Sequence, residues 1–196
     1  MTDARAQLRQ RLRDARTATA PSARIAAAAE LATRLLAFDA VRRARSIAGY
    51  WAVGGEMPLH SLVTRLDAGT RYCLPVLQPD RTLRFAPWRV GDAVEANRYG
   101  IPEPTEAVVA LAPSEIDVVL LPLVGFTRTG HRLGMGGGWY DRSFAFRHLQ
   151  PAPPLLVGVG FAAQQVDDCD VQPWDVPLDA LATERELLVF RGRGPA

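Results

Sequence analysis

The 196-residue sequence predicts one α/β domain spanning residues 1–196, with an open, mainly parallel central sheet between two layers of helices. Three observations favour this Rossmann-like, three-layer α/β/α fold. The chain begins with two amphipathic helical patterns, short apolar segments then recur along it with helical stretches between them, and no linker-like change of composition divides it. A sheet of this kind binds its ligands at the carboxyl ends of the strands, so we expect the functional site there.

Two helices are predicted near the N-terminus, because apolar residues recur there every three or four positions. The first begins near Asp3 and carries Arg5 and Arg9 one turn apart on a neighbouring face. The second has Ser22 as its expected N-cap and ends near Phe38. Their apolar stripes are Leu8, Leu12 and Ala15 in the first helix and Ile25, Ala28, Ala32, Leu35 and Leu36 in the second.

The rest of the chain alternates between strand and helix patterns. The almost wholly apolar segment 116–122 is typical of a parallel strand buried on both faces, so we expect it at the centre of the sheet. The proline-containing segment 97–104 predicts an irregular, stiffened loop. The other predicted strands are 46–51, 72–76, 83–87, 155–160 and 187–190, and the predicted helices are 58–66 and 139–149.

The composition excludes several classes of function, because all 23 basic residues are arginine and the chain has no lysine. Neither a lysine Schiff base nor a P-loop of the form GxxxxGK(S/T) can exist in it. Three histidines and two cysteines, Cys73 and Cys169, are too few for a zinc site or a disulfide framework. Since the N-terminus lacks the apolar core of a signal peptide and no run is long enough to span a membrane, we expect a cytoplasmic protein.

The segment Arg132–Arg142 combines four glycines, two arginines, two aromatic residues and one carboxylate. Glycines let backbone N–H groups approach an anion closely, and a helix starting at Trp139 would offer further unpaired N–H groups. The two arginines would neutralise negative charge. The segment therefore indicates a site for a phosphate-rich ligand, and the alternative is a tight turn that uses glycines for steric reasons alone.

Other motifs for phosphate binding or hydrolysis are incomplete or absent from the sequence. Gly134 and Gly136 fit the dinucleotide fingerprint GxGxxG, but Trp139 stands at its last position. Neither a GxSxG nor an HExxH motif occurs. Two features stay open: His131 would contact a phosphate or lie in an exposed turn, and the acidic run 167–170 would bind a metal or form a solvated turn.

Five motifs follow one another along the chain. They are a basic-x-x-Leu-Arg segment at 5–9, Glu56 after the first strand, Gly-Ile-Pro-Glu-Pro at 100–104, Leu121-Pro122 with Phe126 and the glycine-rich run 132–142, and Pro-x-Asp-x-x-x-Asp with Thr-Glu at 173–184. In this order and spacing they resemble the 5-formyltetrahydrofolate cyclo-ligase family, and the resemblance covers nearly the whole chain. It implies the NagB/RpiA/CoA-transferase-like form of the Rossmann-like sheet.

The resemblance implies a ligase that forms a C–N bond, using ATP and Mg²⁺ to convert 5-formyltetrahydrofolate into 5,10-methenyltetrahydrofolate with release of ADP and phosphate. Phosphorylation of the formyl oxygen would create a leaving group that the folate N10 displaces. Such a transfer depends on positioning and charge neutralisation more than on a covalent protein residue. The resemblance assigns the catalytic contacts to Arg132 and Tyr140 and expects segment 100–104 to shape the folate pocket.

The resemblance also implies the binding residues. Asp141 and Asp175 would hold Mg²⁺, which is commonly bound by carboxylates, water and phosphate oxygens. Glu56 would bind the polar edge of the pterin, with Trp51 and Tyr140 along its flat faces. The residues expected to bind ATP are Arg5, Arg9, Arg132, Leu133, Gly134, Met135, Gly136, Gly137, Gly138, Trp139 and Tyr140.

Three positions depart from the family pattern. Arg5 replaces a lysine and Trp139 replaces a tyrosine, whereas Met135 removes a polar or cationic group, so we expect weaker phosphate binding or slower turnover. The alternatives are a non-catalytic nucleotide- or folate-binding paralogue and a sugar-phosphate or acyl-CoA enzyme of related architecture. Ten arginines against four acids in residues 1–50 also allow nucleic-acid binding. We nevertheless expect a monomer that acts on small molecules, with no nucleic-acid or membrane partner.

Overall fold

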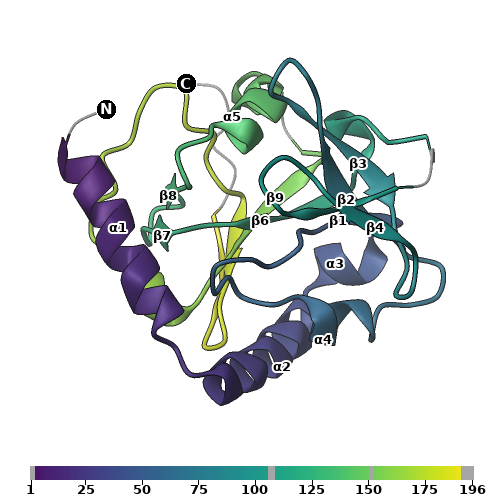
Figure 1. Ribbon diagram of the computed structural model, residues 1–196, viewed down its shortest axis with the longest axis horizontal. Coiled ribbons are helices and arrows are strands. Elements are labelled where there is room, and N and C mark those ends of the chain that lie inside the picture. Colours follow the sequence, from purple (N-terminus) through teal and green to yellow (C-terminus); the bar gives the residue numbers. More distant parts are fainter. Residues whose placement is uncertain (1–2, 106–108, 151, 191–196) are drawn as a thin grey trace.

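The computed structural model describes residues 3–105, 109–150 and 152–190, and it contains the predicted α/β sheet (Figure 1). The strands of the central sheet are β1 Ser46–Ala48, β2 Arg71–Leu77, β3 Leu83–Pro87, β6 Val118–Pro122, β9 Leu155–Val159, β10 Ala180–Ala182 and β11 Leu187–Val189. They lie in the order β11-β10-β9-β6-β1-β2-β3. Neighbouring inner strands pair parallel, and the edge strands β3 and β11 pair antiparallel. The predicted fold class is therefore confirmed.

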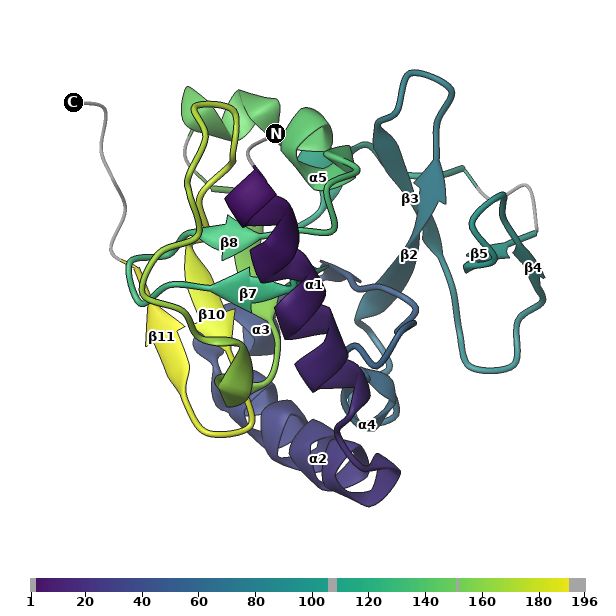
Figure 2. The ribbon, with the colours of Figure 1, turned by 60° about the vertical axis from the view of Figure 1, so that its left-hand side comes forward.

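Helices lie on both faces of this sheet. Figures 1 and 2 show α2, α3 and α4 together on one face, α5 on the other, and α1 alongside the small hairpin β7–β8. The remaining bounds are α1 Asp3–Thr17, α2 Pro21–Ala37, α3 Asp39–Arg43, α4 His60–Val63, α5 Trp139–Ser143, β4 Val94–Ala96, β5 Pro102–Pro104, β7 Gly125–Phe126 and β8 Arg132–Leu133. The described residues also form three short 3₁₀ helices, η1 Pro113–Glu115, η2 Ala145–His148 and η3 Ala162–Gln164.

Strand β6 is buried on both faces, as its apolar sequence predicts. Val118 and Leu120 belong to the apolar cluster that includes Leu31 of α2, whereas Val119 and Leu121 belong to the cluster on the opposite face with Phe144. Successive side chains of a strand point to opposite faces, so an unbroken apolar run suits only a strand that is covered on both sides. The central position of β6 follows from this requirement.

Helix α2 occurs where its spacing predicts, but two details differ. Ser22 is not its N-cap: Ala20 holds that position without a side-chain hydrogen bond, and Pro21 is the first helical residue, where its missing N–H costs nothing. Ile25 is 60% exposed and Leu31 is fully buried, so the stripe that faces the sheet is rotated relative to the predicted one.

Other elements are shorter or more regular than the sequence predicts. The helix expected at 58–66 is reduced to the four residues of α4, and the one at 139–149 changes into η2 after Ser143. Segment 97–104 is not wholly irregular, because its end forms β5, which pairs with β4. Strands of two or three residues, such as β8 and β10, are too short to show a period in the sequence.

Among the described residues, no helix combines the length and the apolar character that crossing a bilayer requires.

The contrast between two residues of α2 provides a test of the fold. We expect Leu31→Ala to lower the free energy of unfolding by about 2–5 kcal/mol, since it leaves a cavity under the helix. Ile25→Ala removes a largely exposed side chain of similar size from the same helix and should change stability by less than about 1 kcal/mol. Urea unfolding followed by circular dichroism measures both values. Equal losses would show that the buried face of α2 is assigned wrongly.

Candidate functional site

A cavity of about 890 Å³ opens at the carboxyl ends of β1, β2 and β6. It is lined by Tyr50 and Trp51, which follow β1, by Leu77 at the end of β2 and by Pro122 at the end of β6. β1 lies between β6 and β2, so the order of the strands reverses direction at this point of the sheet. Ligands of open α/β sheets bind in the crevice that such a reversal creates.

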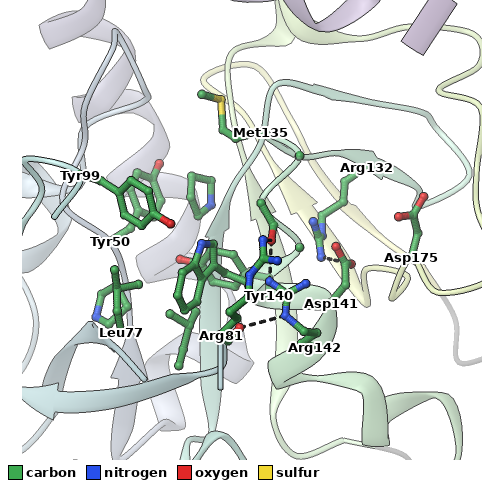
Figure 3. A pocket seen from close by; sticks show the side chains of 18 of the residues that line it. Tyr50, Leu77, Arg81, Tyr99, Arg132, Met135, Tyr140, Asp141, Arg142 and Asp175 are labelled. Carbon is green, nitrogen blue, oxygen red and sulfur yellow. Dashed lines mark hydrogen bonds and ion pairs between the residues drawn. The ribbon is translucent and has the colours of Figure 1, made fainter. Parts of the chain in front are cut away.

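Residues from distant parts of the sequence meet around this cavity. Figure 3 shows Tyr50, Leu77 and Tyr99 on one side and Arg132 and Asp141 on the other. The predicted site residues that line the cavity are Arg5, Arg9, Trp51, Glu56, Arg132, Gly134, Met135, Gly136, Gly137, Gly138, Trp139, Tyr140, Asp141 and Asp175. The expected roles of these residues stay predictions, but their common location is what those roles require.

Leu133 is the predicted site residue that the structure places elsewhere. Its side chain is fully buried and packs with Leu12, Val124 and Cys169 beneath α1. Side chains alternate along β8, so Arg132 points into the cavity and Leu133 points away from it. Leu133 therefore anchors the start of the glycine-rich loop and does not line the site.

The glycine-rich loop has a backbone that needs glycine at defined positions. Gly136 and Gly138 have φ values of 92° and 66°, in the left-handed region that side chains disfavour. Gly138 is also the N-cap of α5, and a Cβ there would lie 2.7 Å from Arg142 Nη1. The helix that follows the loop, α5, is five residues long.

Arginines of α1, of α5 and of the turn between β2 and β3 hold the carbonyl groups of the loop. Arg9 Nε donates to Gly134 O at 2.8 Å, and Gly137 O accepts from Arg142 Nη2 at 2.5 Å and from Arg81 Nη2 at 3.4 Å. The loop is therefore tied to α1, to α5 and to the turn between β2 and β3. Such ties fix the loop before any ligand binds.

The cationic end of the cavity contains arginine donors without acceptors. Nε of Arg5, Nε of Arg132 and Nη1 of Arg9 are buried and have no hydrogen-bond partner among the described residues. Arg5 and Arg132 are 7% and 5% exposed. Burial and the neighbouring charge of Arg5 lower the pKa of Arg9, and Asp175 partly offsets this. Buried N–H donors that lack acceptors are costly, and an anionic ligand would satisfy them.

Two carboxylates lie at the same end and each uses one oxygen within the protein. Asp141 Oδ1 is 2.6 Å from Arg132 Nη2 and accepts from the N–H of Val176 at 3.1 Å. Asp175 Oδ2 is 2.7 Å from Arg5 Nη2 and accepts from the N–H of Gln172 at 2.9 Å.

The other oxygens of these two carboxylates, Asp141 Oδ2 and Asp175 Oδ1, accept no hydrogen bond within the described ranges. Nowhere in those ranges do three or more metal-binding side chains cluster. A cation here would therefore complete its coordination with water and ligand oxygens. This donor set fits Mg²⁺, which usually binds through one or two carboxylates plus phosphate oxygens.

The opposite end of the cavity has flat apolar walls. Tyr99 of the β4–β5 hairpin meets Trp139 edge-on, with ring centroids 6.2 Å apart, and the guanidinium of Arg98 lies 5.4 Å from the Trp139 ring. Tyr140 stacks on Phe144 at 6.3 Å, and burial raises the pKa of Tyr140, so its hydroxyl stays protonated. These walls suit a planar heterocycle.

Glu56 is a buried acid beside these apolar walls. It is 8% exposed, its Oε2 accepts from the N–H of Val53 at 3.1 Å, and its Oε1 lies 3.8 Å from Arg16 Nη1. Burial raises the pKa of Glu56, while the Val53 hydrogen bond and the charge of Arg16 act in the opposite direction. The carboxylate is a hydrogen-bond acceptor within an otherwise apolar region.

Several residues at this site were not predicted. Arg81, Tyr99 and Trp174 line the cavity, but no periodicity or motif marks Arg81 and Tyr99, and only its neighbour Asp175 points to Trp174. In α1 the sequence predicts Ala15 on the buried face, whereas Ala15 is exposed and Arg16 is buried. A charged residue at the edge of an apolar stripe gives no sign in the sequence that it is buried.

The structure places His131 and the acidic run 167–170, whose roles the sequence leaves open. His131 does not line the cavity and lies 3.1 Å from the hydroxyl of Thr129 in the turn between β7 and β8, which favours the turn interpretation. In the acidic run, Asp168 accepts from the N–H of Asp170, and Asp170 lines the cavity.

Comparison with known proteins gives consistent results. The sequence matches the 5-formyltetrahydrofolate cyclo-ligase family over residues 1–184. It is 35% identical to 5-formyltetrahydrofolate cyclo-ligase of Escherichia coli over 181 residues, covering 90% of this chain and 98% of that protein. The protein of the same name from Haemophilus influenzae is 36% identical over 141 residues, covering 70% of this chain and 74% of the relative.

Solved structures agree with the sequence matches. The structure resembles that of 5,10-methenyltetrahydrofolate synthetase from Aquifex aeolicus with a TM-score of 0.83 and 25% identity, covering 98% of this chain and 96% of that one. It shares the fold of the synthetase from Mycoplasma pneumoniae, with a TM-score of 0.72, 23% identity and coverage of 93% and 99%. A match over nearly the whole sequence, joined to the same fold, shows that this chain belongs to the 5-formyltetrahydrofolate cyclo-ligase family.

Proposed function

We propose that this chain is a 5-formyltetrahydrofolate cyclo-ligase that uses ATP and Mg²⁺ to form 5,10-methenyltetrahydrofolate, ADP and phosphate. The observation that carries the proposal is the set of buried arginine donors without acceptors beside the glycine-rich loop. A polyphosphate would supply the missing acceptors and charge. The flat apolar walls at the other end of the same cavity suit the pterin, so both substrates would meet in one site.

The proposed reaction needs the phosphoryl group because a formyl oxygen is a poor leaving group. The γ-phosphoryl group moves to the formyl oxygen, and ADP leaves. N10 then attacks the formyl carbon, N10 loses its proton, and the carbon–oxygen bond breaks with its electron pair departing on phosphate. No covalent protein residue takes part, so catalysis depends on positioning and on stabilising charge.

Arg132 and Tyr140 are the residues proposed to contact the reacting groups. Arg132 is almost fully buried, its Nη2 is held by Asp141 and its Nε has no acceptor in the described part of the chain, so the guanidinium is oriented and still able to bind an oxyanion. Tyr140 follows in the first turn of α5 and lines the cavity with a protonated hydroxyl. A fixed donor of this kind stabilises developing charge without reorganising.

Mg²⁺ would be held by the available oxygens of Asp141 and Asp175, together with phosphate oxygens. When bound, it would neutralise charge on the phosphates. Arg132 and Arg5 would orient the two carboxylates, because each donates to one carboxylate oxygen and leaves the other available. Glu56 would accept hydrogen bonds from the N–H groups along the polar edge of the pterin, and Trp51 and Tyr140 would pack against its faces.

The activity can be tested directly on the purified protein. With 5-formyltetrahydrofolate, ATP and Mg²⁺ we expect the absorbance of the methenyl product to appear together with an equal amount of ADP. Reactions without ATP, or with the metal chelated, should show neither. Failure to form the product at high protein concentration would reject the cyclo-ligase and favour a non-catalytic binding protein.

The metal assignment is tested by Asp141→Asn. We expect kcat to fall about 100-fold or more, because the variant loses a charged ligand of the proposed Mg²⁺. The control is Asp179→Asn, which also breaks an ion pair to a buried arginine, Arg147, at 2.8 Å, but outside the cavity lining. Melting temperatures verify folding. Asp179→Asn should keep a kcat near that of the wild type. If Asp141→Asn also keeps a near-normal kcat, the metal assignment is wrong.

The departure at Met135 is tested by restoring a cation. Met135 is half exposed and lines the cavity, so Met135→Arg should lower the KM for ATP by about threefold to tenfold through a new charge-assisted contact. Leu149→Arg adds the same charge at an exposed position outside the cavity and should leave the KM for ATP unchanged. Identical effects of the two changes would mean that the added charge acts through the general field of the protein.

A further inference from the structure

We infer that Arg16, in the last turn of α1, is a positioning residue that orients Glu56 for folate binding. The inference rests on the proposed function, in which Glu56 binds the pterin, and it adds a residue that neither motif nor family resemblance identifies. Arg16 is not among the residues that line the cavity. It therefore acts on the substrate only through its neighbours.

Arg16 joins three parts of the chain. Its Nε donates to Gly54 O at 3.1 Å, in the loop after β1, and its Nη1 donates to Leu123 O at 3.3 Å, directly after β6. The same Nη1 lies 3.8 Å from Glu56 Oε1. The arginine is 4% exposed, so its charge is removed from water and is compensated by these acceptors.

The turn that carries Glu56 is built against the end of α1. Glu56 N–H donates to Val53 O at 3.1 Å, and Glu56 Oε2 accepts from Val53 N–H at the same distance. Gly54 and Gly55 have φ values of 56° and 78°, and a Cβ on Gly55 would lie 3.3 Å from Arg16 O. One carboxylate oxygen is thus held by the turn itself and the other faces Arg16. Of the polar contacts that the carboxylate makes with the described residues, the one to Val53 would remain without Arg16.

The charge of Arg16 also affects the protonation of Glu56. Burial raises the pKa of Glu56, whereas Arg16 lowers it, so removing Arg16 would raise this pKa further. The other groups near the turn are the phenols of Tyr50 and Tyr140, both kept protonated by burial, and the guanidinium of Arg24 beside Gly55. A protonated Glu56 loses acceptor capacity, so the deficit should be greatest at low pH and should shrink as the pH rises.

The first experiment compares Arg16→Gln with Arg11→Gln, which removes the same charge from an exposed position on the same helix. At saturating ATP and pH 6, we expect Arg16→Gln to raise the KM for 5-formyltetrahydrofolate about tenfold or more, with the KM for ATP unchanged. The increase should be smaller at pH 9. Arg11→Gln should behave as the wild type. An unchanged KM for folate in Arg16→Gln, or an increase that does not depend on pH, would contradict the inference.

The second experiment asks whether Arg16 acts through Glu56. In a Glu56→Gln background, Arg16→Gln should add less than about twofold to the KM for folate, because the group that it orients is gone. A full additional increase in that background would overturn the inference and leave Arg16 with a purely structural role.

Folding and the proposed function are checked separately. Melting temperatures are measured for every variant, and Arg16→Lys, which keeps the charge, replaces Arg16→Gln if the latter does not fold; it should show a smaller increase in KM with little dependence on pH. If the wild type is inactive, the cyclo-ligase proposal fails, and the same variants are compared by calorimetric titration with 5-formyltetrahydrofolate. If the wild type is active and Glu56→Gln has a normal KM for folate, the cyclo-ligase activity stands, but the assignment of Glu56 to the pterin and the inference about Arg16 both fail.

Discussion

The buried guanidinium groups of α1 are the constraint on which the cavity depends. A guanidinium carries five N–H donors and stays charged, so an arginine that leaves water must be given acceptors. Arg5 reaches Asp175 and the carbonyl of Asp170, Arg9 reaches the carbonyl of Gly134, and Arg16 reaches the loops after β1 and β6. The first helix is thereby fastened across the carboxyl ends of the strands, and Arg5 and Arg9, which keep buried donors without acceptors among the described residues, line the cavity.

The two ends of the cavity follow from the two sources of its walls. The apolar end is lined by Trp51 after β1, Leu77 of β2, Tyr99 of the β4–β5 hairpin, and Trp139 and Tyr140 of α5; all of these except Tyr99 pack against the apolar core clusters. The arginine-rich end is built from α1, the glycine-rich loop and the segment before β10. Its charges are paired, Arg132 with Asp141 and Arg5 with Asp175. This division suits a polyphosphate bound beside a planar heterocycle. The charged phosphates need cationic hydrogen-bond donors, whereas the heterocycle is bound by apolar and aromatic walls.

Much of the site could be predicted because its signals are local. The glycine positions reflect backbone angles at Gly136 and Gly138, and Asp141 follows them within the same motif. Residues such as Arg81 and Tyr99 could not be found in this way, because they reach the cavity from a turn and a hairpin whose positions depend on strand pairing. Leu133, which the resemblance assigns to ATP, has its side chain in the core and not in the cavity, and the sequence could not show this because the strand β8 that sets the direction of its side chain is only two residues long.

By itself the sequence determined the central strand β6, the parallel sheet around it and the positions where the loop needs glycine, since apolar runs and glycines act within a few residues. The tertiary structure alone decided which charges are buried. In α1 the spacing favours Ala15 for the interior, yet Arg16 is the buried residue, because the carbonyl oxygens of Gly54 and Leu123 in two distant loops accept its hydrogen bonds. The energy of a buried charge depends on partners far away in the chain, and no local pattern records them.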